Sequence, residues 1–265
     1  MLKSDFGKVA ENYARSRDDI PAILFESLQI RNVSFEGKKV ADLACGTGAL
    51  TRKLKLRKAE VVGVEPSQEL LEEAKKINER KFLSVPYQLG TAENTQLPSN
   101  EFDMVTVMRA WHWFIRQESI TEIKRILKDK GRLIVADSGF VPDHEVVSTT
   151  FSVIKQYVSE IKPAGSKADS KQRMNGFPVE WFEEWSMNGF DLQDFYKLDY
   201  EVSFTNEQWV DRVASLSFIA SMDVSKRNLL LAELSTVLNS QYSPHHIHVI
   251  PHLCTIVILN MQVKK

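Results

Sequence analysis

The chain has 265 residues, of which 43% are hydrophobic, and its formal net charge is −1 at pH 7. This length is ample for one large α/β domain with a buried core. A near-zero charge lacks the positive excess of nucleic-acid-binding proteins, so we expect no nucleic-acid partner. The two cysteines, Cys45 and Cys254, are far apart in the sequence. Such a low count is typical of reduced thiols in a cytoplasmic protein rather than of a disulfide framework.

The N-terminal stretch MLKSDFGKVAENYARSRDD has no apolar core, so we expect no signal peptide. No apolar run approaches the roughly 18 residues that cross a bilayer. We therefore expect a cytoplasmic monomer or homodimer with no membrane partner. Neither a CxxC nor an HExxH spacing occurs, and His245, His246 and His248 have no carboxylate beside them. We expect these histidines to lie on a surface loop, and we expect no metal site.

The first 140 residues alternate between helical and strand patterns. Residues 1–36 are predicted to be helical, with Phe6, Val9, Ala10 and Tyr13 at helical spacing. Short apolar runs predict strands at 38–46, 59–67, 86–93, 102–110 and 131–140. Between them we expect helices at 48–58, 67–81 and 119–131, the second capped by Ser67 and the third ended by Gly131.

After residue 140 the pattern becomes mainly helical. Helices are predicted at 143–162, 179–190, 208–220 and 225–241, and strands at 194–205 and 248–261. Residues 163–176 are rich in small and charged side chains and are predicted to form a mobile surface loop. Gly189 is expected to end helix 179–190. Trp181, Trp185 and Trp209 are expected to anchor the core or a lid.

Apolar strands that alternate with helices indicate a parallel sheet covered on both faces. We therefore predict an α/β fold, with a Rossmann-like, mostly parallel seven-stranded sheet and helical lid and cap insertions. Residues 1–265 are expected to form a single domain. Within it, 1–36 would form the lid, 37–140 the cofactor-binding core, and 141–190 with 205–242 the acceptor-side insertions.

The stretch DLACGTGAL, residues 42–50, joins a strand to a helix through a glycine-containing turn. Such a turn presents backbone N–H groups at a helix N-terminus, and Gly46 and Gly48 permit unusual φ values. Glu65 ends the next strand, where a carboxylate accepts hydrogen bonds from ribose hydroxyls. These features suit either NAD or S-adenosylmethionine.

Two residues favour S-adenosylmethionine. The dinucleotide motif GxGxxG would need glycine at position 51, where this chain has Thr51. Asp42, at the strand end, would repel a pyrophosphate, whereas it suits a cofactor that carries an ammonium and a sulfonium. We therefore predict S-adenosylmethionine as the cofactor.

The segments DLACGTG, VEPS and TAENTQLPSNEFDMVTVMRAWHWF occur in the order and spacing that resemble the class I S-adenosylmethionine-dependent methyltransferases. Within that class the chain looks like the small-molecule branch that includes trans-aconitate-type methyltransferases. The resemblance is closest over residues 1–140 and looser from there to the last strand. It implies methyl transfer to a small-molecule acceptor in a site closed by a lid.

The same resemblance implies the cofactor-binding residues. The methionine part would lie against Asp42, Ala44, Gly46 and Gly48, the ribose against Glu65, and the adenine beside Pro66 and Ser67. Where the family often has Asp-Ala-Glu, this chain has Thr91, Ala92 and Glu93, and the Ala92 backbone or Glu93 would take the place of the aspartate. Met108 would lie near the reacting methyl. In the lid, Tyr13 and Arg17 match a Tyr and an Arg of the family and would close over the cofactor.

Three residues are candidates for catalysis. Tyr13 would lie near the transferring methyl. His112 would act as a base toward a hydroxyl or amine acceptor, or else is a packing histidine between two tryptophans. Arg109 would clamp an acceptor carboxylate, or else forms a structural salt bridge. Cys45 is expected to be a small packing residue rather than a nucleophile.

Two other functions stay open at this point. The turn and Glu65 also fit an NAD-dependent oxidoreductase. A partner protein that binds the cofactor without catalysing a reaction would keep the same turn.

Overall fold

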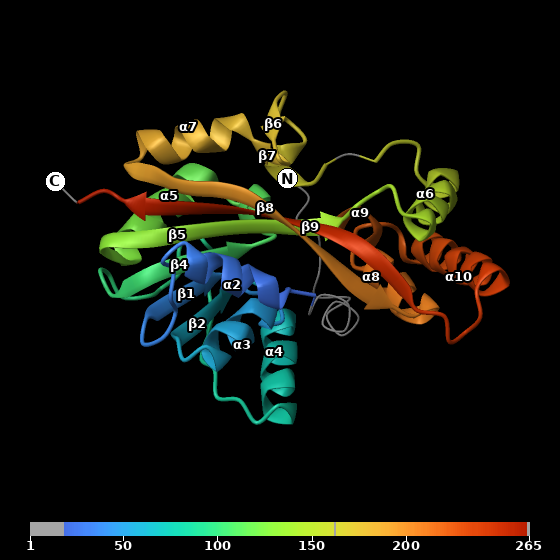
Figure 1. Ribbon diagram of the computed structural model, residues 1–265, viewed down its shortest axis with the longest axis horizontal. Coiled ribbons are helices and arrows are strands. Elements are labelled where there is room, and N and C mark those ends of the chain that lie inside the picture. Colours follow the sequence, from blue (N-terminus) through green and yellow to red (C-terminus); the bar gives the residue numbers. More distant parts are fainter. Residues whose placement is uncertain (1–18, 162, 264–265) are drawn as a thin grey trace.

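The computed structural model describes residues 19–161 and 163–263. Its centre is a seven-stranded sheet with the strand order β3-β2-β1-β4-β5-β9-β8 (Figure 1). All pairs from β3 to β5 are parallel, and β9 is antiparallel to both of its neighbours. The predicted mostly parallel seven-stranded sheet is confirmed. Its strands are β1 Lys39–Leu43, β2 Glu60–Glu65, β3 Tyr87–Leu89, β4 Phe102–Met108, β5 Leu127–Phe140, β8 Phe190–Phe204 and β9 His248–Met261.

Helices cover both faces of this sheet, as predicted. One hydrophobic cluster joins α2 (Ala22–Ile30) and α3 (Ala49–Leu56) to one face. A second cluster joins α5 (Arg116–Ile126) and α7 (Val179–Met187) to the other. Helix α4 (Gln68–Arg80) connects β2 to β3, and its predicted cap is confirmed because the Ser67 hydroxyl accepts from the backbone N–H of Leu70.

Strands β5, β8 and β9 are much longer than the others and carry a group of helices at one end (Figure 1). This cap consists of α6 (Glu145–Tyr157), α8 (Asn206–Ala214), α9 (Ser217–Ala220) and α10 (Val224–Gln241). It has its own hydrophobic cluster, in which Trp209 is fully buried and donates to the hydroxyl of Thr150. The cap therefore packs as a unit on the extended ends of β8 and β9.

The predicted insertion 141–190 divides between two places. Helix α6 joins the cap, whereas α7 lies on the sheet beside α5, to which a bidentate Arg116–Glu184 ion pair ties it. Trp181 and Trp185 of α7 are both about 1% exposed, so the prediction that they are anchors is confirmed for the sheet core. Gly189, with a φ of 81°, follows this helix as predicted.

Three predicted elements differ from the structure. Helix α5 ends at Ile126 rather than at Gly131, because the fully buried Leu127 already pairs with Phe102 in the sheet. The predicted helix 208–220 is broken into α8 and α9 near Ser215, whose hydroxyl bonds the carbonyl of Arg212. In the predicted helical region 1–36, the described part from residue 19 is helical only over Ala22–Ile30.

The predicted loop 163–176 also carries structure. It contains a 3₁₀ turn, η3 (Gly165–Lys167), and β6 (Arg173–Met174), which pairs with β7 (Phe177–Pro178). Lys167 forms an ion pair with Asp137 near the end of β5. The segment is thus tied to the sheet by this half-buried ion pair rather than being a free surface loop.

Candidate active site

The turn after β1 is built around the buried carboxylate of Asp42. Asp42 is 1% exposed, and its oxygens accept hydrogen bonds from the hydroxyls of Thr51 at 2.6 Å and Thr106 at 2.8 Å. Burial nevertheless raises the pKa of Asp42 to about 6, because the two hydroxyls only partly replace water around the charge. A cation placed beside this carboxylate would favour its ionised form.

Thr51 has a definite role in this turn. It stands where the dinucleotide motif has its third glycine, which allows close packing of helix on strand, and here its side chain holds Asp42 instead. The chain turns tightly because Ala44, Gly46 and Gly48 all have positive φ values, of 51°, 57° and 76°. A side chain at Gly48 would collide with the hydroxyl of Tyr87, so this glycine is needed for packing as well as for its backbone conformation.

Glu65, at the end of β2, lies directly against the turn. One carboxylate oxygen accepts from the backbone N–H of Gly46 at 2.9 Å, and the other accepts from that of Ser67 at 3.1 Å. Burial raises the pKa of Glu65 to about 7, and these two bonds oppose the shift. Each oxygen keeps a lone pair, so the group can still accept hydrogen bonds from a ligand.

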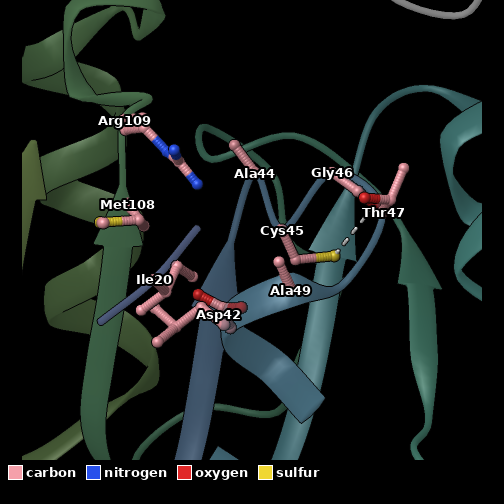
Figure 2. A pocket seen from close by; sticks show the side chains of 10 residues that line it. Ile20, Asp42, Ala44, Cys45, Gly46, Thr47, Ala49, Met108 and Arg109 are labelled. Atoms are coloured by element: carbon pink, nitrogen blue, oxygen red, sulfur yellow. Dashed lines mark hydrogen bonds between the residues drawn. The ribbon is translucent and has the colours of Figure 1, made fainter. Parts of the chain in front are cut away.

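A pocket opens between this turn and the end of β4. Figure 2 shows Met108 and Arg109 on the β4 side, facing Ala44 and Cys45 of the turn, with Asp42 and Ile20 at the base. The structure therefore brings together four of the predicted cofactor residues in one pocket: Asp42, Ala44, Gly46 and Met108. The predicted lid residues Tyr13 and Arg17 lie outside the described residues.

Arg109 is held in place by an acidic partner. Its φ is 59°, its backbone N–H donates to the carbonyl of Ala136, and its guanidinium contacts the Asp19 carboxylate at 2.5 Å. Both side chains are more than nine-tenths buried. The structural salt bridge, one of the two roles predicted for Arg109, is therefore present at the pocket wall.

The remaining predicted adenine-side residues lie around the ends of β2 and β3. Pro66 and Ser67 follow Glu65, and Ala92 is buried. Thr91 accepts the backbone N–H of Asn94 and so closes a short turn. The carboxylate of Glu93 accepts from the backbone N–H of Ile115 and from the hydroxyl of Ser119, so it is tied to the start of α5.

His112 belongs to a short 3₁₀ turn, η2 (Trp111–Trp113), just beyond β4. It is 8% exposed, and its ring lies 4.9 Å from that of Trp113. The backbone of Gly165 packs so closely on the His112 carbonyl that no side chain fits at position 165. The segment around η3 therefore covers His112 and reaches Asp137 through Lys167.

The histidines of HHIH do not all lie on the surface. His245 and His246 are exposed, whereas His248 is 2% exposed and shares a 2.6 Å hydrogen bond with Asn206. The predicted surface position is thus wrong for His248, which begins β9.

Among residues 19–161 and 163–263, no three Cys, His, Asp or Glu side chains are placed to hold a metal ion. In the same ranges, no helix combines the length and apolarity needed to cross a membrane.

Sequence patterns missed several polar residues near the pocket. Arg212 of α8 is 1% exposed and lies 3.7 Å from the Asp19 carboxylate. His252 of β9 is also 1% exposed. The inward position of His252 could have been read from the alternation along β9, because Ile250 and Cys254 on either side of it are buried apolar residues.

Comparisons with known proteins agree with this geometry. The family model described as "Methyltransferase domain" matches residues 41–135, which span β1 to β5. Residues 41–135 are therefore similar to a methyltransferase domain. The described residues share their α/β fold with solved structures of methyltransferases.

Similar proteins in other organisms are also methyltransferases by name. An uncharacterized methyltransferase of Schizosaccharomyces pombe is 27% identical over 192 residues, which is 67% of this chain and 73% of that protein. An uncharacterized methyltransferase of Mycobacterium bovis is 34% identical over 132 residues, or 50% of this chain and 51% of that protein. The chain thus matches only about half the length of the mycobacterial relative.

A solved structure confirms the fold beyond the methyltransferase domain. A putative type II methyltransferase from Anaeromyxobacter dehalogenans superposes with a TM-score of 0.62 at 20% identity. The superposition covers 91% of this chain and 96% of that one. A phosphoethanolamine N-methyltransferase of Haemonchus contortus, solved with S-adenosylhomocysteine, has a TM-score of 0.52 at 17% identity, over 91% of this chain and 52% of that chain.

Proposed function

We propose that this protein transfers the methyl group of S-adenosylmethionine to a small-molecule acceptor. The observation that carries this proposal is the buried Asp42 carboxylate at the base of the pocket, beside Met108. A carboxylate in this position attracts a cationic ligand and repels the pyrophosphate of NAD. S-adenosylmethionine carries an ammonium and a sulfonium, so it matches the charge of the pocket.

In this proposal, different residues of the turn and its surroundings contact different parts of the cofactor. Asp42 would pair with the cationic methionine part, and Ala44 and Gly46 would pack against it. Glu65 would accept the ribose hydroxyls with its remaining lone pairs, and Pro66 and Ser67 would flank the adenine. On the adenine amino group, the Ala92 backbone rather than Glu93 is the proposed contact, because the Glu93 carboxylate already accepts hydrogen bonds at the start of α5.

The bound cofactor supplies a methyl group on a positively charged sulfur. The protein's contribution is to align the acceptor and exclude water, which supplies roughly 7–11 kcal/mol of the barrier in well-oriented systems. Arg109 stands at the pocket wall, and His112 lies under the segment that contains η3. Both, together with Tyr13, stay proposed catalytic residues.

The cap supports a small acceptor. Helices α6, α8 and α10 pack on the extended ends of β8 and β9, beside the polar residues that surround Arg109. A pocket bordered by such a cap suits a small molecule better than a protein or nucleic-acid chain. The net charge of −1 agrees with that choice.

Binding and product analysis together test this function. The full chain is titrated calorimetrically with S-adenosylmethionine, and it is then incubated with small acids, phenols, amines and thiols while products are detected by mass. We expect saturable binding and one class of methylated product. Binding without any methylated product would favour a non-catalytic cofactor-binding protein, and absence of binding would contradict the cofactor assignment.

A further inference from the structure

A group of polar side chains lies on the sheet face next to Arg109. These side chains have no role in the methyl transfer proposed above. Phe140 of β5 pairs with His252 of β9, which pairs with Tyr200 of β8. Ser138 precedes Phe140 by two residues and so points to the same face. The rings of Tyr200 and His252 are 5.3 Å apart. We call Ser138, Tyr200 and His252 the polar cluster.

Each member of this cluster carries a buried polar atom without a hydrogen bond. Across the described ranges 19–161 and 163–263, this holds for the Ser138 hydroxyl, the Tyr200 hydroxyl and Nε2 of His252. Buried polar groups are nearly always paired in folded proteins, because an unpaired one loses its hydrogen bonds to water without replacement. The Ser138 and Tyr200 hydroxyls lie close enough to interact with each other. Nε2 of His252 has no partner in the described ranges, so this nitrogen marks the cluster as a place for a polar ligand.

The tautomer of His252 follows from its other ring nitrogen. Nδ1 lies 2.8 Å from the backbone carbonyl of Ile250. Because a carbonyl only accepts, Nδ1 carries the proton and Nε2 presents a lone pair. Burial, together with the nearby Arg212 and Arg109, lowers the pKa of His252, so the ring is neutral at neutral pH.

Two arginines lie beside the polar cluster and are joined by Asp19. Arg109 contacts one oxygen of the Asp19 carboxylate at 2.5 Å, and Arg212 lies 3.7 Å from the other. The Arg212 guanidinium also lies over the ring of Phe140, which contacts the ring of His252. Asp19 thus fixes both guanidinium groups on the same side as the cluster.

The polar cluster is close to the proposed cofactor pocket. Arg109 lines that pocket, and so does Ile20, the residue after Asp19 (Figure 2). Arg109 therefore borders the cofactor pocket and also lies near enough to His252 to influence its charge.

We propose that the polar cluster binds the reacting hydroxyl of the acceptor and that His252 is the base that accepts its proton. This inference rests on the proposed function and specifies its substrate class as a weakly acidic hydroxyl, such as a phenol or an enol. Two fixed guanidinium groups stabilise an oxyanion and disfavour an ammonium, so an oxygen acceptor suits the site better than an amine. A carboxylate is already ionised at neutral pH and would leave His252 without a role.

The step balances without a further reactant. The acceptor oxygen forms a bond to the methyl carbon while the carbon–sulfur bond breaks, and the electron pair of that bond stays on sulfur. The hydroxyl proton moves to Nε2 of His252, which becomes an imidazolium. Asp19 lies near this ring and opposes the repulsion from the two arginines.

An optical binding experiment tests this assignment without turnover. The full chain, saturated with S-adenosylhomocysteine, is titrated with 4-nitrophenol just below the pH at which the free probe ionises. Nitrophenolate has a visible absorbance band that the neutral phenol lacks.

We expect the wild-type protein to bind the probe in its ionised form. His252→Gln should abolish the band of the bound probe or weaken binding at least about tenfold. Tyr200→Phe should weaken binding about threefold to tenfold and keep the band.

The chain offers a matched control for each variant. His248 is also buried on β9, but its Nε2 is bonded to Asn206, so His248→Gln should keep the band. Tyr196 lies on β8 with its hydroxyl bonded to Ser27, so Tyr196→Phe should bind the probe normally. S-adenosylhomocysteine affinity, measured by calorimetry, should be the same in all four variants. That affinity also shows whether each variant is folded.

Three results would overturn the proposal. In the first, the wild-type protein binds S-adenosylhomocysteine but not the probe. In the second, His252→Gln retains the band of the bound nitrophenolate. In the third, His112→Gln removes the band, which would make His112 the base. Failure to bind S-adenosylhomocysteine at all would instead contradict the proposed function, so the two failures are distinguishable.

Discussion

The two sides of the candidate active site are built from different kinds of sequence information. On the cofactor side, Asp42, Gly46 and Glu65 lie within 24 residues of each other in a continuous β-α-β unit. On the acceptor side, Asp19, Arg109, Arg212 and His252 come from four distant parts of the chain. Local motifs therefore describe the first side well, whereas only the folded sheet brings the second side together.

The charges on the two sides also differ. The cofactor side presents two carboxylates whose pKa values burial has raised, and both become easier to ionise beside a cation. The acceptor side presents guanidinium groups held by Asp19. A cationic donor on one side and an electron-rich acceptor on the other is the charge pattern that methyl transfer from a sulfonium needs.

Replacing the buried carboxylate of the turn should have the largest effect. Asp42→Asn is expected to weaken S-adenosylmethionine binding about 100-fold, within the ~2–5 kcal/mol typical of losing one partner of a buried charge pair. The free energy of unfolding of the ligand-free protein should change little or rise, since the amide removes a buried charge. Calorimetry and urea unfolding measure the two quantities, with Asp103→Asn, at a partly exposed ion pair, as the control. Unchanged affinity would contradict the role of Asp42.

Cofactor affinity should also depend on pH. Since the pKa values are about 7 for Glu65 and about 6 for Asp42, both groups take up protons as the pH falls through this range. A ligand that prefers the ionised groups should bind roughly tenfold more weakly at pH 6 than at pH 8. The free energy of unfolding of the ligand-free protein should depend on pH in the opposite direction. Because burial raises both pKa values, these two groups stabilise the folded state less as the pH rises toward 7. Calorimetric dissociation constants across this range check the first sign, and a pH-independent affinity would contradict it.

Substitutions at two glycines test whether the segment around η3 packs against His112. Gly165 and Gly176 both have positive φ values, of 54° and 84°, but only Gly165 has no room for a side chain, because it packs on His112. Gly165→Ala should destabilise the protein by ~1–3 kcal/mol more than Gly176→Ala, the usual cost of overpacking. Cofactor affinity should be equal in both variants, and thermal unfolding with calorimetry measures the pair. Equal stability would mean that the segment around η3 does not rest on His112.

The smallest effect is expected at Cys45. Burial, with the Asp42 and Glu65 carboxylates nearby, raises the pKa of the Cys45 thiol well above its usual range, so it is a poor nucleophile. Its sulfur packs where a side chain at Gly63 would otherwise lie. Cys45→Ala should therefore change methylation rates by less than about twofold, as activity assays would show, because a half-buried thiol of this kind acts as a small apolar group. A loss of turnover with intact cofactor binding would assign Cys45 a chemical role.

The sequence predicted the fold, and it located the turn of the proposed cofactor side, because both depend on short-range patterns. The strand–turn–helix pattern located β1, β2 and β4. Position 51 holds threonine rather than glycine, and in the structure the Thr51 hydroxyl donates a hydrogen bond to Asp42. The end of α5 was mispredicted because Leu127 follows its sheet partner Phe102 rather than local helix propensity.

The acceptor side could not be predicted in the same way. Lys167 looked like one residue of a polar loop, yet it pairs with Asp137 of β5, thirty positions earlier in the chain. The sequence analysis did not single out His252, and only the β5–β9–β8 register places it beside Tyr200. Such contacts depend on strand order, which no local spacing records.

Parallel titrations of the full chain with S-adenosylmethionine and with NAD test the central claim most directly. Asp42, held by Thr51 and Thr106 at the base of the pocket, predicts saturable binding of S-adenosylmethionine and no detectable binding of NAD. Binding of NAD, or of neither compound, would contradict it.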